Sequence, residues 1–140
     1  MTDLSLTVSR TIDAPIKAVF DAWLNPRMLP MFMLPGDGMS VPRAEVDARE
    51  GGRFDIVMAA GDREMPHGGT YLEITPHSRI VFTWESPFSI DGSTVTIDLK
   101  ESPGGTDITL RHVKFPDEES RANHEAGWGR IVDTLSGVLA

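Results

Sequence analysis

The sequence feature that most constrains the fold is the amphipathic segment 117–140. Its spacing predicts one long helix whose apolar face carries His124, Trp128, Ile131, Leu135 and Val138. The sequence before it is mainly typical of strands. A helix of this kind must bury one face, and beside a single antiparallel sheet we expect it to lie across the concave side. We also expect a cavity there, large enough for a small apolar molecule.

The rest of the chain predicts an ordered series of short elements. Residues 4–12 alternate between apolar and polar side chains, and a short helix follows Pro15 and ends at Asn25-Pro26. Six further strands are indicated, at residues 41–47, 53–59, 69–75, 79–85, 93–101 and 106–113. The turns between them are too short for parallel crossovers, so neighbouring strands should be antiparallel. The predicted fold class is α+β.

Composition excludes several classes of partner. Thirteen basic and twenty-one acidic residues give a formal net charge of −8, and no run of Lys or Arg could follow a phosphate backbone. We therefore expect no nucleic-acid partner and no membrane association. The chain has no cysteine, which rules out disulfides and thiolate metal ligands. Neither a signal segment nor a membrane span is recognisable, so we expect one domain over residues 1–140 in the cytoplasm.

Four stretches of the sequence resemble a known superfamily. They are RTIDAPIKAVFDAWLNP, the glycine pair before Arg53, the run GGTYLEITPHSRIVFTWES, and HEAGWGRIVDTL. Together they resemble the helix-grip superfamily, which includes plant pollen allergens, lipid-transfer domains and polyketide cyclases. Within it the chain is most similar to the group named after the activator of Hsp90 ATPase. The resemblance implies a curved seven-stranded antiparallel sheet around a long C-terminal helix, with two short helices after the first strand and a cavity between sheet and helix.

Trp128 lies between two glycines, each of which costs a helix about 1 kcal/mol relative to alanine. One interpretation is that the glycines allow close backbone approach while the indole closes one end of a ligand chamber. The other is that Trp128 is an ordinary large core residue, which is the commoner role of aromatic residues at helical spacing. The two interpretations are compatible, because a cavity wall is also part of a core.

Two histidines are candidates for proton transfer. His124 lies one helical turn before Trp128, and His112 shares a strand face with Ile108 and Leu110. A zinc site normally needs three or four protein ligands, and no spacing supplies a third, so we expect no metal and no cofactor. The alternative is that both imidazoles are hydrogen-bonded residues at the rim of the chamber.

Carboxylates offer a second route to acid–base chemistry. Glu73 shares a strand face with Tyr71, but Leu72 and Ile74 could equally form the buried face. Glu85 falls with the outward set of its strand. Most strand carboxylates are solvated, so Glu73 remains a candidate only.

The methionine-rich segment 28–39 contains several helix breakers, which predict a short helix or an irregular apolar loop. It could plug one end of the core, form an adaptable lid over the chamber, or receive a partner chain.

These observations support three functional hypotheses. The first is binding of a small hydrophobic molecule, and the second is a cyclase- or hydrolase-type reaction that uses His124 or His112 with Glu73 or Tyr71. The third, implied by the resemblance, is stimulation of an Hsp90-type chaperone, although the chain is a lone domain without the extra N-terminal domain of the eukaryotic co-chaperones. A homodimer through exposed strand edges is also possible. The expected cavity residues are Trp23, Met31, Phe32, Met33, Met58, Tyr71, Trp84, His112, His124 and Trp128.

Overall fold

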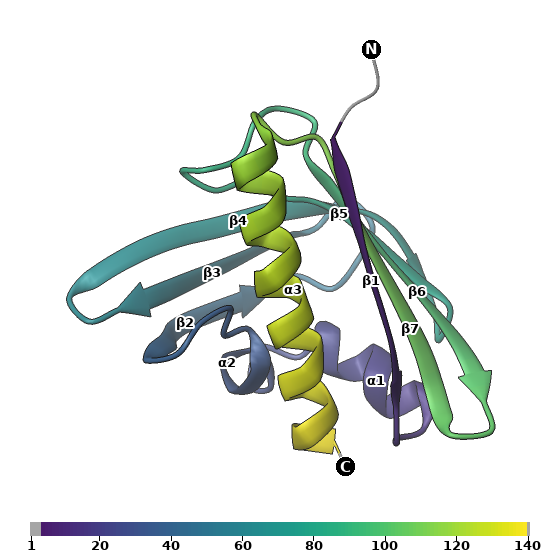
Figure 1. The fold of residues 1–140 in the computed structure, drawn as a ribbon. Helices are drawn as coiled ribbons and strands as arrows, with labels where there is room; N and C mark the ends of the chain where they lie inside the picture. Colours follow the sequence, from purple (N-terminus) through teal and green to yellow (C-terminus); the bar gives the residue numbers. More distant parts are fainter. Residues whose placement is uncertain (1–3, 140) are drawn as a thin grey trace.

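The computed structural model describes residues 4–139, which form a curled antiparallel sheet with a long helix across its concave face (Figure 1). The strands are β1 (Ser5–Ile12), β2 (Met39–Val46), β3 (Arg53–Ala60), β4 (Arg63–Thr75), β5 (Arg79–Thr83), β6 (Thr94–Ser102) and β7 (Gly105–Val113). The helices are α1 (Ile16–Trp23), α2 (Leu29–Phe32) and α3 (Glu118–Leu139). The predicted fold class, strand number and element order are confirmed. Ala140, the expected last residue of the helix, lies outside the described residues.

The sheet order is β1-β7-β6-β5-β4-β3-β2, and every neighbouring pair is antiparallel. The first strand therefore joins the last, which places β1 at one edge and β2 at the other. Helix α3 contacts β1 and α2, while α1 lies near β6 and β7. In Figure 1 the two short helices lie beside the C-terminal end of α3. The N-terminal end of α3 lies above β3 and β4.

Alternation along the strands separates a core face from a solvent face. In β6, for example, Val95, Ile97 and Leu99 are buried, whereas the residues between them are partly exposed. The outer face carries cross-strand pairs such as Arg79 with Asp98, whose Nε and Oδ1 atoms are 2.6 Å apart. One face of the sheet therefore packs on the helices.

Strand β4 departs from the prediction in two ways. It begins at Arg63 rather than at residue 69. Its first part pairs with β3, and β5 pairs only with its far end, so Pro66 lies where the strand has one neighbour and a proline is tolerated. A β-bulge between Tyr71 and Glu73 then breaks the alternation. Tyr71 is consequently buried, while Glu73 is half-buried and accepts a hydrogen bond from Thr75 Oγ1 (2.8 Å).

Burial along α3 is uneven. All of its buried residues lie in the stretch from Gly127 to Leu135, and none lies in the first nine residues of the described helix. That first part is polar. Arg121 bridges Glu118 and Glu125 there, each at 2.6 Å, and Asp117 Oδ1 accepts a hydrogen bond from the Ser120 amide (2.8 Å). Only the later half of α3 is therefore clasped by the core.

Candidate functional site

A cavity of about 680 Å³ opens beneath the polar first half of α3. It is mostly apolar, and its walls come from the start of α3, the β3–β4 hairpin, the loop between β5 and β6, and the residues around the start of β2. The lining residues are Pro35, Met39, Met58, Met65, His67, Trp84, Pro87, Phe88, Ser89, Ile90, Pro116, Asp117, Glu119, Ser120, Asn123, His124, Gly127, Trp128 and Ile131.

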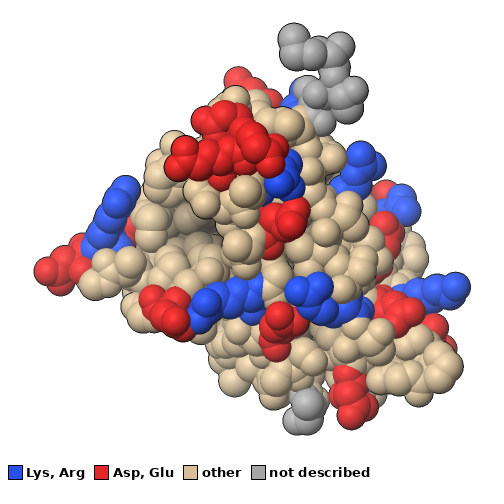
Figure 2. All heavy atoms as spheres, viewed as in Figure 1, with Lys and Arg blue, Asp and Glu red and all other residues tan. Residues whose placement is uncertain are grey.

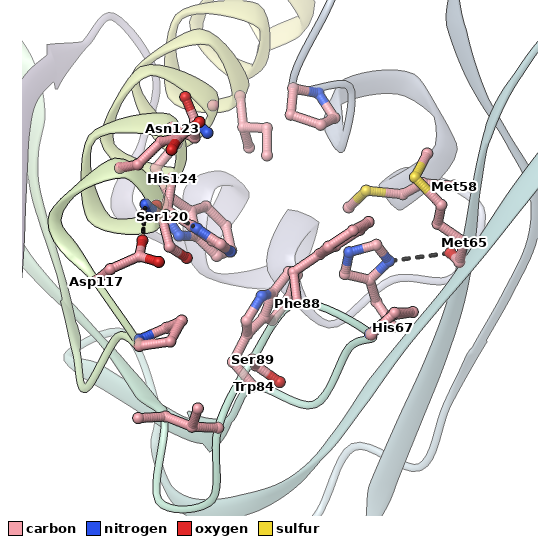
Figure 3. A pocket seen from close by; sticks show the side chains of 18 of the residues that line it. Met58, Met65, His67, Trp84, Phe88, Ser89, Asp117, Ser120, Asn123 and His124 are labelled. Atoms are coloured by element: carbon pink, nitrogen blue, oxygen red, sulfur yellow. Dashed lines mark hydrogen bonds between the residues drawn. The ribbon is translucent and has the colours of Figure 1, made fainter.

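Two walls of this cavity face each other in Figure 3. Asn123 and His124 project from α3 on one side, while Met58, Met65 and His67 lie on the opposite side. The β5–β6 loop forms the rim between them. Its Phe88 and Ile90 are 46% and 41% exposed, and the two together give this rim an apolar surface. The cavity rim therefore presents large apolar side chains to solvent.

Behind this wall lies a buried hydrogen-bonded network centred on His112. Trp128 Nε1 donates to His112 Nδ1 (3.0 Å), and His112 Nε2 lies 2.6 Å from Ser93 Oγ. An indole N–H is only a donor, so Nδ1 must accept and the imidazole proton must be on Nε2, which donates to Ser93. The network fixes the orientation of the Trp128 ring in the cavity wall.

This tautomer has a chemical consequence. A serine nucleophile is activated by an imidazole nitrogen that accepts its proton, whereas His112 donates to Ser93. Burial, with a smaller contribution from the charge of His124, lowers the pKa of His112 to about 3. Ser93 and His112 are thus arranged as a structural pair rather than as a nucleophile and its base.

Two other histidines face the cavity with one ring nitrogen already used. His67 Nδ1 lies 3.0 Å from the Met65 carbonyl oxygen, and His124 Nδ1 lies 2.8 Å from the Ser120 carbonyl oxygen. A carbonyl can only accept, so both Nδ1 atoms carry the proton. Burial is the main cause that lowers the pKa of His67, which is therefore neutral at pH 7 with Nε2 as an acceptor.

Trp84 supplies an unpaired donor beside His67. Its ring centroid is 5.1 Å from that of His67 and 4.9 Å from that of Trp128, and the residue is only 4% exposed. Within residues 4–139 its buried Nε1 has no hydrogen-bond partner. A buried donor left unpaired costs roughly 1–3 kcal/mol, so a partner for this group would be stabilising.

The charged residues at the cavity are acidic. Asp117 and Glu119 are among its lining residues, and the described lining contains neither lysine nor arginine. Figure 2 shows the acidic side chains gathered over the first turns of α3, beside a hollow in the surface. An anionic molecule would meet unfavourable charge at this mouth.

Comparison with known proteins identifies the family. Residues 13–140 match the family described as Activator of Hsp90 ATPase homolog 1-like protein. The chain belongs to this family. The resemblance seen in the sequence is therefore confirmed.

Several solved structures share the fold of this chain over most of its length. A protein from Chromobacterium violaceum is 27% identical with a TM-score of 0.86, and 96% of each chain is covered. A protein from Nitrosomonas europaea is 26% identical with a TM-score of 0.82, covering 97% of this chain and 94% of that one. An AHSA1-like protein from Aeromonas hydrophila is 26% identical with a TM-score of 0.81, covering 96% and 90%. A comparison with curated proteins found no match.

Four of the ten cavity residues expected from the sequence line the cavity: Met58, Trp84, His124 and Trp128. Trp128 combines both interpretations, since it is 2% exposed and also lines the cavity. At Gly127 a Cβ atom would lie 3.1 Å from Pro35 Cβ, which favours the close-approach interpretation there.

The structure places the other six away from the cavity. Trp23, Phe32, Met33 and Tyr71 are buried in the core, and His112 lies behind the wall. Met31 is 52% exposed on the surface of α2. The segment 28–33 therefore plugs the core, while Pro35 and Met39 extend from it to the cavity.

The carboxylate candidate Glu73 lies outside the cavity lining, as does Glu85, which was expected to face outward. Glu73 is held at the bulge by Thr75, and Glu85 lies on the outer face with its Oε1 atom 3.0 Å from Arg53 Nη2. The hydrogen bond from Arg53 lowers the pKa of Glu85 below its usual value. The ion pair of Glu85 with Arg53 is therefore not the arrangement of a general acid with a raised pKa.

Sequence reasoning missed His67, Met65, Phe88 and Ile90. The expected start of β4 left His67 in a loop, and the available signal was the alternation of Met65 and His67 on either side of Pro66. Within the described part of the chain no cluster of three His, Asp or Glu side chains could hold a metal ion. Among the same residues no helix is long and apolar enough to cross a membrane.

Proposed function

We propose that the protein binds a small, largely apolar molecule in the cavity beneath the first half of α3. The observation that carries this proposal is the cavity itself, about 680 Å³ and walled by methionine and aromatic side chains. Pockets of this size, mostly apolar with a few convergent polar groups, are the usual sites for small ligands.

The composition of the wall supports this function. Met39, Met58 and Met65 line the side away from α3, and methionine side chains adapt to ligands of irregular shape. Two aromatic residues, Trp84 and Trp128, also border the cavity and are 4% and 2% exposed. A ligand would also cover part of the exposed side chain of Phe88, which gains free energy by leaving water.

Access is provided by the β5–β6 loop. Ser86 and Ser89 close a turn in it, since the Ser86 amide donates to Ser89 Oγ at 2.8 Å. Phe88 lies between them and projects over the cavity in Figure 3. Opening this loop would admit a ligand without disturbing the sheet.

The test is a titration with N-phenyl-1-naphthylamine, a neutral apolar dye whose fluorescence rises in a dry site. Ser120 lines the cavity, so Ser120→Phe should fill part of it and weaken dye binding at least about tenfold. Ala122 is exposed on the same helix and is not among the cavity residues, so Ala122→Phe is the matched control and should bind like the parent protein.

Circular dichroism and thermal melting of both variants check that they remain folded. Failure of the parent protein to bind this dye or any other neutral apolar probe would overturn the proposal. Equal binding by the parent protein and a folded Ser120→Phe variant would overturn it as well.

A further inference from the structure

The polar groups in the cavity wall narrow the chemistry of the ligand. We infer, building on the proposed function, that the ligand is an uncharged ring compound bearing a hydroxyl group, and that this hydroxyl binds between His67 and Trp84.

The free hydrogen-bonding groups of His67 and Trp84 are complementary to a hydroxyl group. His67 Nδ1 is committed to the Met65 carbonyl at 3.0 Å, which leaves Nε2 as an acceptor. Trp84 Nε1 is a buried donor without a partner among residues 4–139. A hydroxyl group can donate to the imidazole and accept from the indole at the same time, and an ether or an ammonium group cannot.

His67 and Trp84 lie next to each other in the cavity wall. The rings of His67 and Trp84 have centroids 5.1 Å apart and planes inclined at 45°, and both belong to the cavity wall. A single oxygen atom bridging two ring nitrogens at ordinary hydrogen-bond lengths needs nitrogens no more than about 6 Å apart. The two ring centroids lie within this span, and a hydroxyl that pairs with the buried indole N–H must enter the wall between the two rings.

The charge of the cavity wall disfavours anionic ligands. The described cavity lining includes Asp117 and Glu119 but no lysine or arginine. A carboxylate or phosphate ligand would lose its hydration without gaining a cationic partner, which is strongly unfavourable in an apolar site. Fatty acids and other organic anions are therefore poor ligands on this account.

The aromatic residues of the wall favour a ligand that contains a planar ring. Trp84 and Trp128 lie 4.9 Å apart with planes inclined at 60°, and Phe88 lies on the rim. Aromatic walls favour planar ring compounds through offset and edge-to-face contacts. His124, whose Nδ1 is committed to the Ser120 carbonyl, offers a second acceptor on the α3 side for a ligand with a second hydroxyl.

Three probes of one ring system separate these features: 2-naphthol, 2-methoxynaphthalene and 2-naphthoate. Tryptophan fluorescence quenching at pH 7.5 gives the three dissociation constants. We expect 2-naphthol to bind about tenfold more tightly than 2-methoxynaphthalene, because only the former pairs both protein groups. 2-Naphthoate should bind more weakly than either.

Variants assign the preference to the proposed groups. In His67→Phe the ratio between the 2-naphthol and 2-methoxynaphthalene constants should fall to about one, because the acceptor is gone. Ala122→Phe, outside the cavity, should keep the tenfold ratio.

Each outcome is decisive. Equal binding of 2-naphthol and 2-methoxynaphthalene, tightest binding of 2-naphthoate, or an unchanged ratio in a folded His67→Phe variant would overturn the inference while the proposed function stands. If none of the three probes and no other neutral apolar probe binds, the proposed function fails and the inference fails with it.

Discussion

The two halves of α3 differ in what lies beneath them. From Gly127 to Leu135 the helix is buried against the sheet and α2, with Leu135 fully inaccessible to solvent. Before Gly127 it carries ion pairs on its outer side and His124 over a cavity of about 680 Å³. One helix therefore serves as core in one half and as the roof of a candidate binding site in the other.

Stability and the proposed binding function thus depend on different ends of the same helix. Tight packing accounts for most of the free energy of folding, whereas a binding site needs space that packing would remove. The buried pair of Trp128 and His112 lies at the junction of the two halves. It anchors the roof to β7 through a hydrogen bond of 3.0 Å.

The largest expected difference between the two regions is in the response to losing a phenylalanine. Phe32 is fully buried in the plug beside the packed half, and Phe88 is 46% exposed at the cavity rim. Phe32→Ala should lower the free energy of unfolding by about 3–5 kcal/mol, and Phe88→Ala by less than about 1 kcal/mol. Urea unfolding measures both, and similar losses for the two variants would contradict the division of α3 into packed and hollow halves.

A smaller effect is expected at the junction. Trp128→Phe removes the donor to His112 Nδ1, whereas Trp23→Phe removes an Nε1 group that has no partner among residues 4–139. Both tryptophans are buried, so the loss of volume is similar. Trp128→Phe should therefore cost about 1–3 kcal/mol more than Trp23→Phe in the same unfolding experiment. A larger loss in Trp23→Phe would show that the bond to His112 contributes little.

A third expected effect is a pH dependence of stability, which is seen only at acidic pH. His112 has a pKa of about 3 in the folded protein and 6.5 as its ordinary value, so between these limits the unfolded chain binds more protons. The stability that depends on a neutral His112 is fully present above pH 6.5 and is lost as the pH falls toward 3. The slope should approach about 1.4 kcal/mol per pH unit below pH 6.5.

The matched variant is His112→Asn, which removes the titrating group. Between pH 5 and 6.5, above the range of most carboxylates, its unfolding free energy should vary less with pH than that of the parent protein. His67, whose pKa is also lowered by burial, is present in both proteins and cancels in the comparison. Parallel pH profiles for the two proteins would contradict the assignment.

The fold could be predicted from the sequence because its signals are local. Alternation gave the strands, and the spacing of Trp128, Ile131 and Leu135 gave the buried face of α3. The predicted start of β4 was wrong because Pro66 and two glycines weaken the strand signal. These residues are tolerated in the strand because this part of β4 pairs with β3 on one side. A bulge such as the one after Tyr71 has no recognisable sequence pattern. The sequence therefore could not decide which face of the sheet Glu73 lies on.

The cavity was harder to predict than the core. An apolar residue such as Phe32 or Met33 has the same sequence signal whether it fills the interior or borders a void, and the structure shows both filling it. Phe88 and Ile90 belong to a loop without periodicity. A chaperone partner, a homodimer and a cytoplasmic location stay predictions.

The central claim is that the hollow under the first half of α3 receives an apolar molecule. The three tryptophans report on it directly, since Trp84 and Trp128 line the cavity and Trp23 is buried in the core. We predict that 2-naphthol, added to ¹⁵N-labelled protein, shifts the indole N–H signals of Trp84 and Trp128 and saturates, with a smaller change at Trp23. A titration that moves none of the three signals, or the Trp23 signal most, would contradict the account.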